Sequence, residues 1–578
     1  MEEYADMFAR IDESEVDTLA QRAIELFNQG QLEEAIKLFE QGNYLEKLDD
    51  ALKVKTQAEE LRQKADSADV LADKDIEEYK KSIQAQVSAY KMSNEWNKAA
   101  ELLKGLADKL QTLDVIWNYA IFSQNLNQFT EAEKYYKLYK NKLSILANTR
   151  SEAYKSSMAA CYNNLASLYC DTRRFTDSEQ MYKSALEIYK RLADSNPQMY
   201  EPDLALCYNN LAVLYYFTRR FADSEAMHKS ALEIRKRLAK SNLQTYEPDL
   251  AMSYSNLGIL YSATRRFADS EQMHKSALEI RKCLAKSNPL AYEPILSDSY
   301  NNLGILYRAT HRFADSEAMH KSALEIRKRL ADTNPHAYNP DLAGSYHNLA
   351  NLYSVTQRFT ESEQMYNSAL EIYKRLMGEN SFIYGQKQAD CLFWFAHLQL
   401  KQGKTTEAIS PLEQALEFYK KEAEQGKSID YYTKIMSWLH QLYGQEKKYS
   451  QAYQCFKQNI PLLKTLYQLK NSDYIELLKG ILVSQSFFSI FEKQYIEAEN
   501  YSKEALEVDS TKHVAYSNLA AALLFQGKYQ EAEKIYRQYK SELKEGFLSD
   551  FEEFSKAGVI PKNREEDVER IKQLLLKE

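Results

Sequence analysis

The chain has 578 residues, and its 75 lysines and arginines against 83 aspartates and glutamates give a formal net charge of 75 − 83 = −8. The charges are interspersed, which argues against a nucleic-acid partner, because binding nucleic acid needs a concentrated basic surface. Glycine (15) and proline (10) are scarce for this length, and Ala, Leu, Glu, Lys, Gln and Tyr dominate. This composition indicates helices rather than strands.

The sequence gives no sign of a membrane or secretory segment. No apolar run approaches the roughly 20 residues that a membrane-spanning helix needs, and the acidic start MEEYADMFARIDESE lacks the apolar core of a secretory signal. The six cysteines form no CxxC pair and occupy scattered positions, which is typical of thiols in a reducing compartment. We therefore expect a cytoplasmic protein without a membrane partner.

The amino-terminal part divides into two predicted elements. Residues 1–44 predict a helical hairpin. Residues 45–77 form a charged segment in which mainly alanine residues recur at spacings of three and four, which predicts a long helix. Two roles stay open for this helix: it lies back on the rest of the chain, or it forms an arm for a homodimer or another partner.

A unit of 46 residues then recurs through the middle of the chain. In the copy at 208–231, residues Tyr208 to Tyr215 and Phe221 to Ala231 each place apolar or small side chains on one helix face, separated by a Thr-Arg-Arg turn. A small residue on the second helix lets the two helices approach closely. It recurs at Ala35, Ala99, Ala132, Ser178, Ser224, Ser270, Ser316, Ser362, Ala408, Ala452, Ala498 and Ala532.

This pattern resembles the tetratricopeptide repeat, in a longer form similar to that of kinesin light chains and of bacterial multidomain proteins. The resemblance implies an all-α fold, a right-handed α-solenoid superhelix of about twelve antiparallel helix hairpins. We expect irregular repeats over 78–150, five regular 46-residue repeats over 151–380, divergent repeats over 381–544 and capping helices over 545–578. Within the regular unit, a loop is expected at Asn196-Pro197, and the next first helix is expected to begin at Pro202.

One asparagine recurs on the first helix of each unit, although asparagine is a poor residue inside helices. By its motif position it faces the concave surface, and the resemblance implies that such a column holds the main chain of an extended peptide, because an amide both donates and accepts. The alternative is that these asparagines bond to neighbouring helices. The column is Asn118, Asn164, Asn210, Asn256, Asn302 and Asn348.

Two tryptophans, Trp394 and Trp438, continue the same column. They predict either an aromatic site for an anchoring side chain of the partner or core packing where the motif is less regular. Three and seven residues after each asparagine the side chains are largely apolar in the middle of the array. These positions hold Ser167, Val213, Ile259, Ile305 and Asn351, and Asp171, Phe217, Ala263, Ala309 and Val355.

Other recurring residues have structural explanations. Arginine at the hairpin turn is followed three residues later by an acidic residue, which predicts local ion pairs. Histidines 228, 274 and 320 share their frame with Tyr182 and Tyr366, which indicates packing. No GxSxG, HExxH or phosphate-binding glycine loop occurs, so we expect no enzyme, no cofactor and no metal site.

The sequence thus predicts a non-catalytic scaffold or adaptor for protein–protein interaction. It would bind an extended segment of a protein or peptide partner in its concave groove. The resemblance also suggests an alternative: a regulatory subunit that controls a separately encoded effector, such as a caspase-like protease or a nucleotide-binding protein. That contact would use the ends or the convex face of the array.

Overall fold

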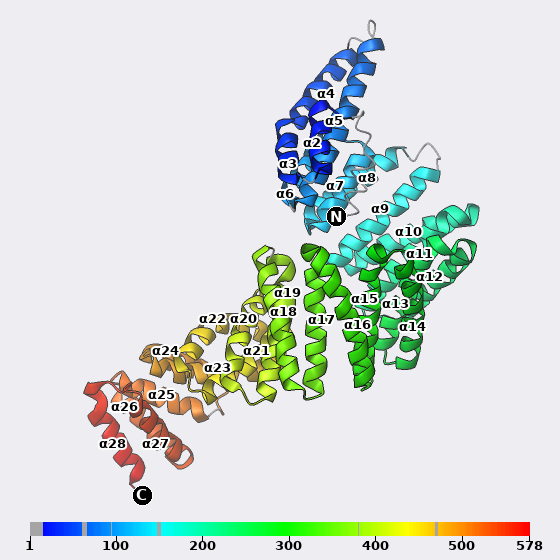
Figure 1. Ribbon diagram of the computed structural model, residues 1–578. Helices are drawn as coiled ribbons and strands as arrows, with labels where there is room; N and C mark the ends of the chain where they lie inside the picture. The colour runs from blue at the N-terminus through cyan, green and yellow to red at the C-terminus, as the bar shows by residue number, and fades with distance from the viewer. Residues whose placement is uncertain are drawn as a thin grey trace. The chain divides into compact units, whose positions relative to one another are not determined.

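The computed structural model describes residues 16–29, 31–60, 66–93, 95–146, 152–379, 381–468, 472–511 and 513–577. They form two compact units, residues 1–287 and residues 288–578. Every element in the described ranges is helical, and none of these residues lies in a strand (Figure 1). The all-α prediction is confirmed.

In the first unit each helix packs against the next one along the chain, except that α3 packs against α5 rather than α4 (Figure 1). Its helices are α2 (Thr18–Asn28), α3 (Leu32–Gln41), α4 (Tyr44–Glu60), α5 (Asp66–Met92), α6 (Trp96–Leu110), α7 (Leu113–Asn125), α8 (Phe129–Leu146), α9 (Glu152–Asp171), α10 (Phe175–Ser195), α11 (Pro197–Phe217), α12 (Phe221–Ser241), α13 (Leu243–Ala263) and α14 (Phe267–Ser287).

The second unit continues in the same manner and ends in a different packing. Its helices are α15 (Pro289–Ala309), α16 (Phe313–Thr333), α17 (Pro335–Val355), α18 (Phe359–Glu379), α19 (Ser381–Lys401), α20 (Thr405–Glu424), α21 (Ile429–Gln445), α22 (Tyr449–Gln468), α23 (Ser472–Phe491), α24 (Tyr495–Val508), α25 (His513–Phe525), α26 (Tyr529–Gln538), α27 (Lys540–Lys556), a 3-10 turn at Lys562–Arg564 and α28 (Glu565–Leu576).

The regular 46-residue unit consists of two 21-residue helices, a three-residue turn and one linking residue. In the copy formed by α11 and α12, the middle turn residue Arg219 has a left-handed φ of 58°, and the Arg220 amide donates to the Tyr215 carbonyl at 2.8 Å. This bond ties off a free carbonyl at the end of the first helix. The same geometry recurs in each regular turn.

The first helix of each regular unit begins earlier than expected. Asn196 caps α11 by accepting a hydrogen bond from the Met199 amide at 3.3 Å, and Pro197 is the first helical residue. Pro202 therefore lies inside the helix, and the expected start at Pro202 is wrong. An asparagine cap followed by proline favours a helix start at Pro197, because proline at this position loses no helical bond.

The small residue of the second helix behaves as predicted. All twelve of these alanines and serines are completely buried, at 0% exposure. Where the residue is serine, its hydroxyl finds a partner within the hairpin: Ser224 Oγ donates to the Ala212 carbonyl at 2.8 Å. The buried hydroxyl is thus satisfied without separating the helices.

Residues 45–77 do not form one long helix. They are divided between α4 and α5, which pack together as a hairpin. The physical reason is an apolar face on α4, where Tyr44, Leu48 and Ala51 are buried, so the segment joins the core instead of extending away from it. Residues 61–65, between the two helices, lie outside the described ranges.

The carboxyl-terminal segment covers the last hairpins. Phe547, Phe551 and Phe554 on α27 are buried together with residues of α23, α25 and α26. Residues Tyr474–Phe491 of α23 are long and apolar enough to cross a membrane by length and composition alone. In the structure this helix packs between α22 and α24, and 44% of that stretch is buried.

Candidate functional site

The recurring asparagine lies on an exposed stripe of each first helix. We define the ladder face as the side chains at the asparagine position, four residues before it, and three and seven residues after it, which share one side of an α-helix. Asn118 is exposed, and the other five asparagines are half-buried. On α11 the same stripe carries Leu206 and Phe217, which is 61% exposed.

The asparagines also connect neighbouring first helices. Asn210 Nδ2 donates to Asn163 Oδ1 at 3.2 Å, and this bond recurs one unit later. The equivalent pairs are Asn256 with Asn209 at 2.8 Å and, in the second unit, Asn348 with Asn301 at 2.7 Å. One N–H of the amide is thereby held by the scaffold, while an asparagine amide has two.

The acceptors in these bonds are a part of the site that the sequence analysis did not assign. Asn163 and Asn209 are the first asparagines of the recurring Tyr-Asn-Asn stretch, and both are buried. The sequence signal that could have identified them is that they recur every 46 residues, each directly before a ladder asparagine. The structure thus brings together two asparagine columns, one buried and one half-exposed.

Apolar side chains flank the asparagines on the ladder face. Ile259 on α13 is 41% exposed, and Val355 on α17 in the second unit is 45% exposed. Exposed aliphatic and aromatic groups on successive first helices are typical of a surface that binds another protein. The structure adds that these apolar side chains are exposed.

A row of buried arginines lies beneath this face, on the second helices. Arg235, only 2% exposed, donates through Nη1 to Ser253 Oγ at 2.8 Å. Burial lowers the pKa of its guanidinium, against the opposing effect of Asp249. In the second unit the equivalent Arg327 also pairs with a carboxylate, that of Asp298 on the ladder face, at 2.5 Å.

The two tryptophans of the column pack against aromatic neighbours. Trp438 stacks on Phe393 with ring centroids 5.0 Å apart and on His397 at 5.5 Å. Trp394 meets the same two rings edge-on, at 5.3 Å and 5.6 Å. Both indoles join the core cluster of α19 to α23 as half-buried members, so packing accounts for their positions, and a ligand contact remains a proposal.

The turn arginines form ion pairs, as predicted, and these pairs also join successive hairpins. Arg220 pairs with Asp223 at 2.7 Å and with Glu179 of the preceding hairpin at 2.8 Å. Glu179 also accepts from the Tyr215 hydroxyl and pairs with Lys183. Burial raises the pKa of Glu179, but the hydrogen bonds from its three donors outweigh burial and leave the pKa below its usual value.

The recurring histidines are packing residues. His228, His274 and His320 are buried, and the ring of His274 lies against Gly258, where a Cβ would come within 2.7 Å of it. Burial, assisted by Arg235, lowers the pKa of His228 to about 4. The imidazole is therefore neutral at ordinary pH.

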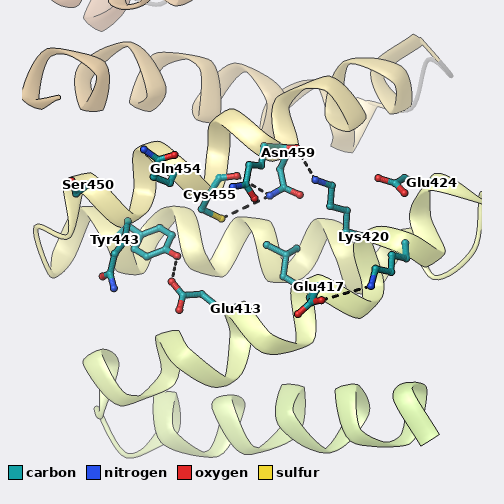
Figure 2. A pocket seen from close by; sticks show the side chains of 13 residues that line it. Glu413, Glu417, Lys420, Glu424, Tyr443, Ser450, Gln454, Cys455 and Asn459 are labelled. Atoms are coloured by element: carbon teal, nitrogen blue, oxygen red, sulfur yellow. Dashed lines mark hydrogen bonds and ion pairs between the residues drawn. The ribbon is translucent and has the colours of Figure 1, made fainter. Parts of the chain in front are cut away.

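One cavity lies away from the ladder face, between the second helices α20 and α22 (Figure 2). Its volume is about 730 Å³. Figure 2 shows Glu413 accepting from the Tyr443 hydroxyl at one end, while Lys420 Nζ donates to the Gln458 carbonyl at the other, at 2.8 Å. Most of the residues around it are of polar types, including three glutamines on α22, but the surface that they turn to the cavity is largely apolar.

Within the described ranges, His, Cys, Asp and Glu form no group of three or more that could hold a metal ion. All six cysteines are free thiols. Burial raises the pKa of the Cys161 and Cys207 thiols to about 12, which makes them poor nucleophiles.

Comparison with known proteins agrees with this architecture. One family model described as the tetratricopeptide repeat matches residues 157–237 and 341–421, and a second model with the same description matches 250–283, 296–336 and 514–538. No curated protein sequence matches the chain.

Two solved structures are similar in part. BtubC (BKLC) from P. vanneervenii is 26% identical, and the match covers 43% of this chain and 92% of that chain at a TM-score of 0.33. The apo form of RapI is 15% identical, with 54% of this chain and 99% of that chain covered at a TM-score of 0.40. The recurring motif, the helix hairpins and the family matches lead to one assignment: the chain is a tetratricopeptide repeat protein.

Proposed function

We propose that the chain is a non-catalytic, cytoplasmic scaffold that binds a segment of a partner protein on its ladder face. Tetratricopeptide repeats are protein-interaction modules. The observation that carries the proposal is the exposed stripe on successive first helices, where half-buried asparagine amides alternate with apolar side chains such as Phe217 and Ile259.

The bonds between asparagines support a binding role as well as a structural one. The contact between Asn210 and Asn163 fixes the orientation of the Asn210 amide, and a ligand then binds to a group that is already ordered. The second N–H is available to a main-chain carbonyl of the partner. Each such bond contributes only about 0.5–1.5 kcal/mol, so affinity requires several asparagines together with apolar contacts. Asn118, Asn164, Asn210, Asn256, Asn302, Asn348, Trp394 and Trp438 form the proposed site.

A pull-down from native lysate tests this function. The intact chain is compared with a variant in which Asn164, Asn210, Asn256 and Asn302 are all changed to alanine. The matched control changes Asn163 and Asn209 to alanine, which removes the bond between helices at its buried end and keeps the surface amides.

We expect the partner to be lost by the fourfold variant and retained by the control with weaker binding, because the control loses only the ordering of the amides, with helicity equal by circular dichroism. A partner that remains bound to the fourfold variant would contradict ladder-face binding. In that case the cavity between α20 and α22 favours the second candidate, a regulatory subunit that contacts its effector through the second helices. Substituting Gln454 and Lys420 by glutamate would then reduce capture.

A further inference from the structure

At the end of the second unit, the ladder face is already occupied by a helix of the same chain. The Phe554 ring of α27 is fully buried and contacts the rings of Phe487 and Phe491 on α23, with centroids 5.5 Å apart in both pairs. It also meets Phe525 on α25 at 5.7 Å. The asparagine position is occupied by Ser484 on α23 and by Asn518 on α25. Phe487 and Phe491 lie three and seven residues after Ser484, and Phe525 lies seven residues after Asn518.

The residue before this phenylalanine makes a charged contact. Glu553 pairs with Lys447 at 3.2 Å and accepts a hydrogen bond from the Tyr449 hydroxyl. Lys447 is the middle residue of the turn between α21 and α22, with a left-handed φ of 50°. The helix α27 therefore presents an aromatic ring to the ladder face and a neighbouring carboxylate to the basic turn at its edge.

The first unit holds the equivalent positions uncovered, with one aromatic ring among them instead of three. Arg173 occupies the middle of the turn after α9, with φ 58°, and its side chain is exposed. Val213 and Phe217 lie three and seven residues after the asparagine of α11, and Ala263 lies seven after that of α13. Phe217 is 61% exposed, whereas its counterpart Phe491 is packed under α27.

We propose that the ladder face of α9, α11 and α13 binds an amphipathic helix of a partner protein with the chemistry of α27. A phenylalanine of that helix enters between Val213, Phe217 and Ala263, and the acidic residue before it pairs with Arg173. The inference rests on the proposed function, because it names the partner class that this face takes. A helix satisfies its own main-chain bonds, so the asparagines here would contact side chains of the partner.

The segment α27 supplies the probe. A fluorescent peptide with the sequence of residues 540–557, KSELKEGFLSDFEEFSKA, acetylated and amidated, is titrated with the full-length protein and followed by anisotropy. We expect saturable binding that Phe217→Asp weakens at least about tenfold, because it places a charge where an aromatic ring is buried. Replacing Phe554 by alanine in the peptide weakens binding to the same extent.

The matched control is Ile145→Asp, an equally drastic change at a side chain that is 74% exposed on α8, away from the ladder face. We expect it to leave the affinity unchanged. Since Phe217 and Ile145 are both exposed, both variants should melt like the intact chain.

Charge reversal provides a test that a purely structural role would not pass. Arg173→Glu weakens binding several-fold, and a peptide carrying Glu553→Lys recovers most of the loss on that variant. Two results would overturn the proposal. In the first, binding of the peptide does not saturate. In the second, Phe217→Asp leaves binding unchanged, which would mean that the peptide displaces the chain's own α27 instead. If a partner depends on the ladder asparagines while the peptide does not bind, only the helix proposal fails. If both experiments are negative, the scaffold function fails with it.

Discussion

At position 258 the first helix has no room for a methyl group. A Cβ on Gly258 would lie 2.7 Å from the ring of His274, and the same holds for Gly304 and His320. The equivalent position is alanine in the units that carry His228, Tyr182 and Tyr366. The helix spacing is thus set locally by one small residue and one ring.

We expect Gly258→Ala to destabilise the protein by up to about 1 kcal/mol, because the imidazole must move within a close-packed interface. The cost is limited, since His228 is accommodated beside Ala212 in the preceding unit. Gly344→Ala is the matched control: a Cβ there meets nothing within 4 Å, and alanine favours the helix by up to about 1 kcal/mol. Thermal unfolding followed by circular dichroism should show opposite shifts. A lower melting temperature for Gly344→Ala would contradict this account.

The buried arginines offer a second comparison within the chain. Arg327 has a carboxylate partner in Asp298, while the residue equivalent to Asp298 in the unit of Arg235 is Leu206, which is exposed on the ladder face. In the part of the chain that the structure describes, no carboxylate forms an ion pair with Arg235. A buried guanidinium without such a partner is costly.

Leu206→Asp should therefore raise stability, by up to about 1 kcal/mol, because it supplies the missing carboxylate at a partly exposed site. The neutral variant Leu206→Asn tests whether charge is responsible. We expect the melting temperature to rise only for aspartate, and the gain to shrink at high salt. An equal response of the two variants would show that no ion pair forms.

At the scale of single residues, some of these features could be predicted from the sequence and others could not. The small residues and the histidine–tyrosine exchange were predictable, because each depends on spacing within one hairpin. The burial of Arg235 and the bond from Asn210 to Asn163 were not predictable, because both depend on which side chain of the neighbouring helix comes within reach. The identity of a residue does not reveal how far its side chain lies from one on the neighbouring helix.

Among the elements, the three-residue turn is the most regular. Its middle residue has φ between 58° and 60° in each of the five regular copies, and the residues there are Arg173, Arg219, Arg265, His311 and Gln357. Left-handed backbone costs a side chain roughly 1 kcal/mol, and glycine avoids that cost. The same turn in the divergent repeats carries glycine at Gly403 and Gly527.

Arg219→Gly should stabilise the chain by up to about 1 kcal/mol by removing this strain. Arg220→Gly, one residue later, should destabilise it. That arginine pairs with Glu179 and Asp223 and lies over the Tyr215 ring with its Cζ 4.1 Å from the centroid. Melting temperatures of the two variants, measured side by side, decide whether the strain or the ion pairs control the turn.

Helix boundaries were predicted less well than helix existence. The start expected at Pro202 is wrong because Asn196 and Pro197 supply a cap and a first-turn proline five residues earlier. The carbonyl that loses its partner to Pro202 is that of Gln198, in the exposed first turn, where water can replace the missing donor. Both prolines suit a helix start, and the sequence alone did not distinguish them.

For the whole molecule, low pH weakens the repeated contacts between successive hairpins together. Each of these contacts joins a glutamate of one hairpin to the turn arginine and a tyrosine of the next. Glu179 and its equivalents Glu133, Glu225 and Glu317 have pKa values below the usual 4.5. Because the folded pKa is lowered, these carboxylates contribute stability above pH 4.5, and the contribution is lost as the pH falls below it. The buried histidines act in a higher range, between 6.5 and about 4.

A falling pH also lowers stability through the histidines. The unfolded chain takes up a proton on His228 below pH 6.5, while the folded chain does so only near pH 4, so a falling pH favours unfolding. We expect His228→Tyr, which installs the residue found at 182 and 366, to flatten the loss of stability between pH 6.5 and 4 by at most about 3 kcal/mol. Loss below pH 4 should persist. Melting curves across this range that coincide with those of the intact chain would contradict the assignment.

The overall architecture was the most predictable level, since it follows from local motifs repeated many times. The proposed site was predictable only as a column of positions. That an asparagine column also connects helices, and that a helix already covers the last part of the ladder face, depends on contacts between distant segments.

The ion-pair contact between successive hairpins affects how a repeat chain can change its length. Glu179 contacts Arg220 and Tyr215 in the same way as Glu225 contacts Arg266 and Tyr261 one unit later. Removing residues 197–242 would bring Asn196 directly before Leu243 and Glu179 opposite Arg266, so that this ion pair would form again. Tyr189 would then replace Arg235 opposite Ser253. Deleting or duplicating a whole unit in frame therefore preserves the helix cap and the ion pair between hairpins, and it changes the number of asparagine positions in the array by one.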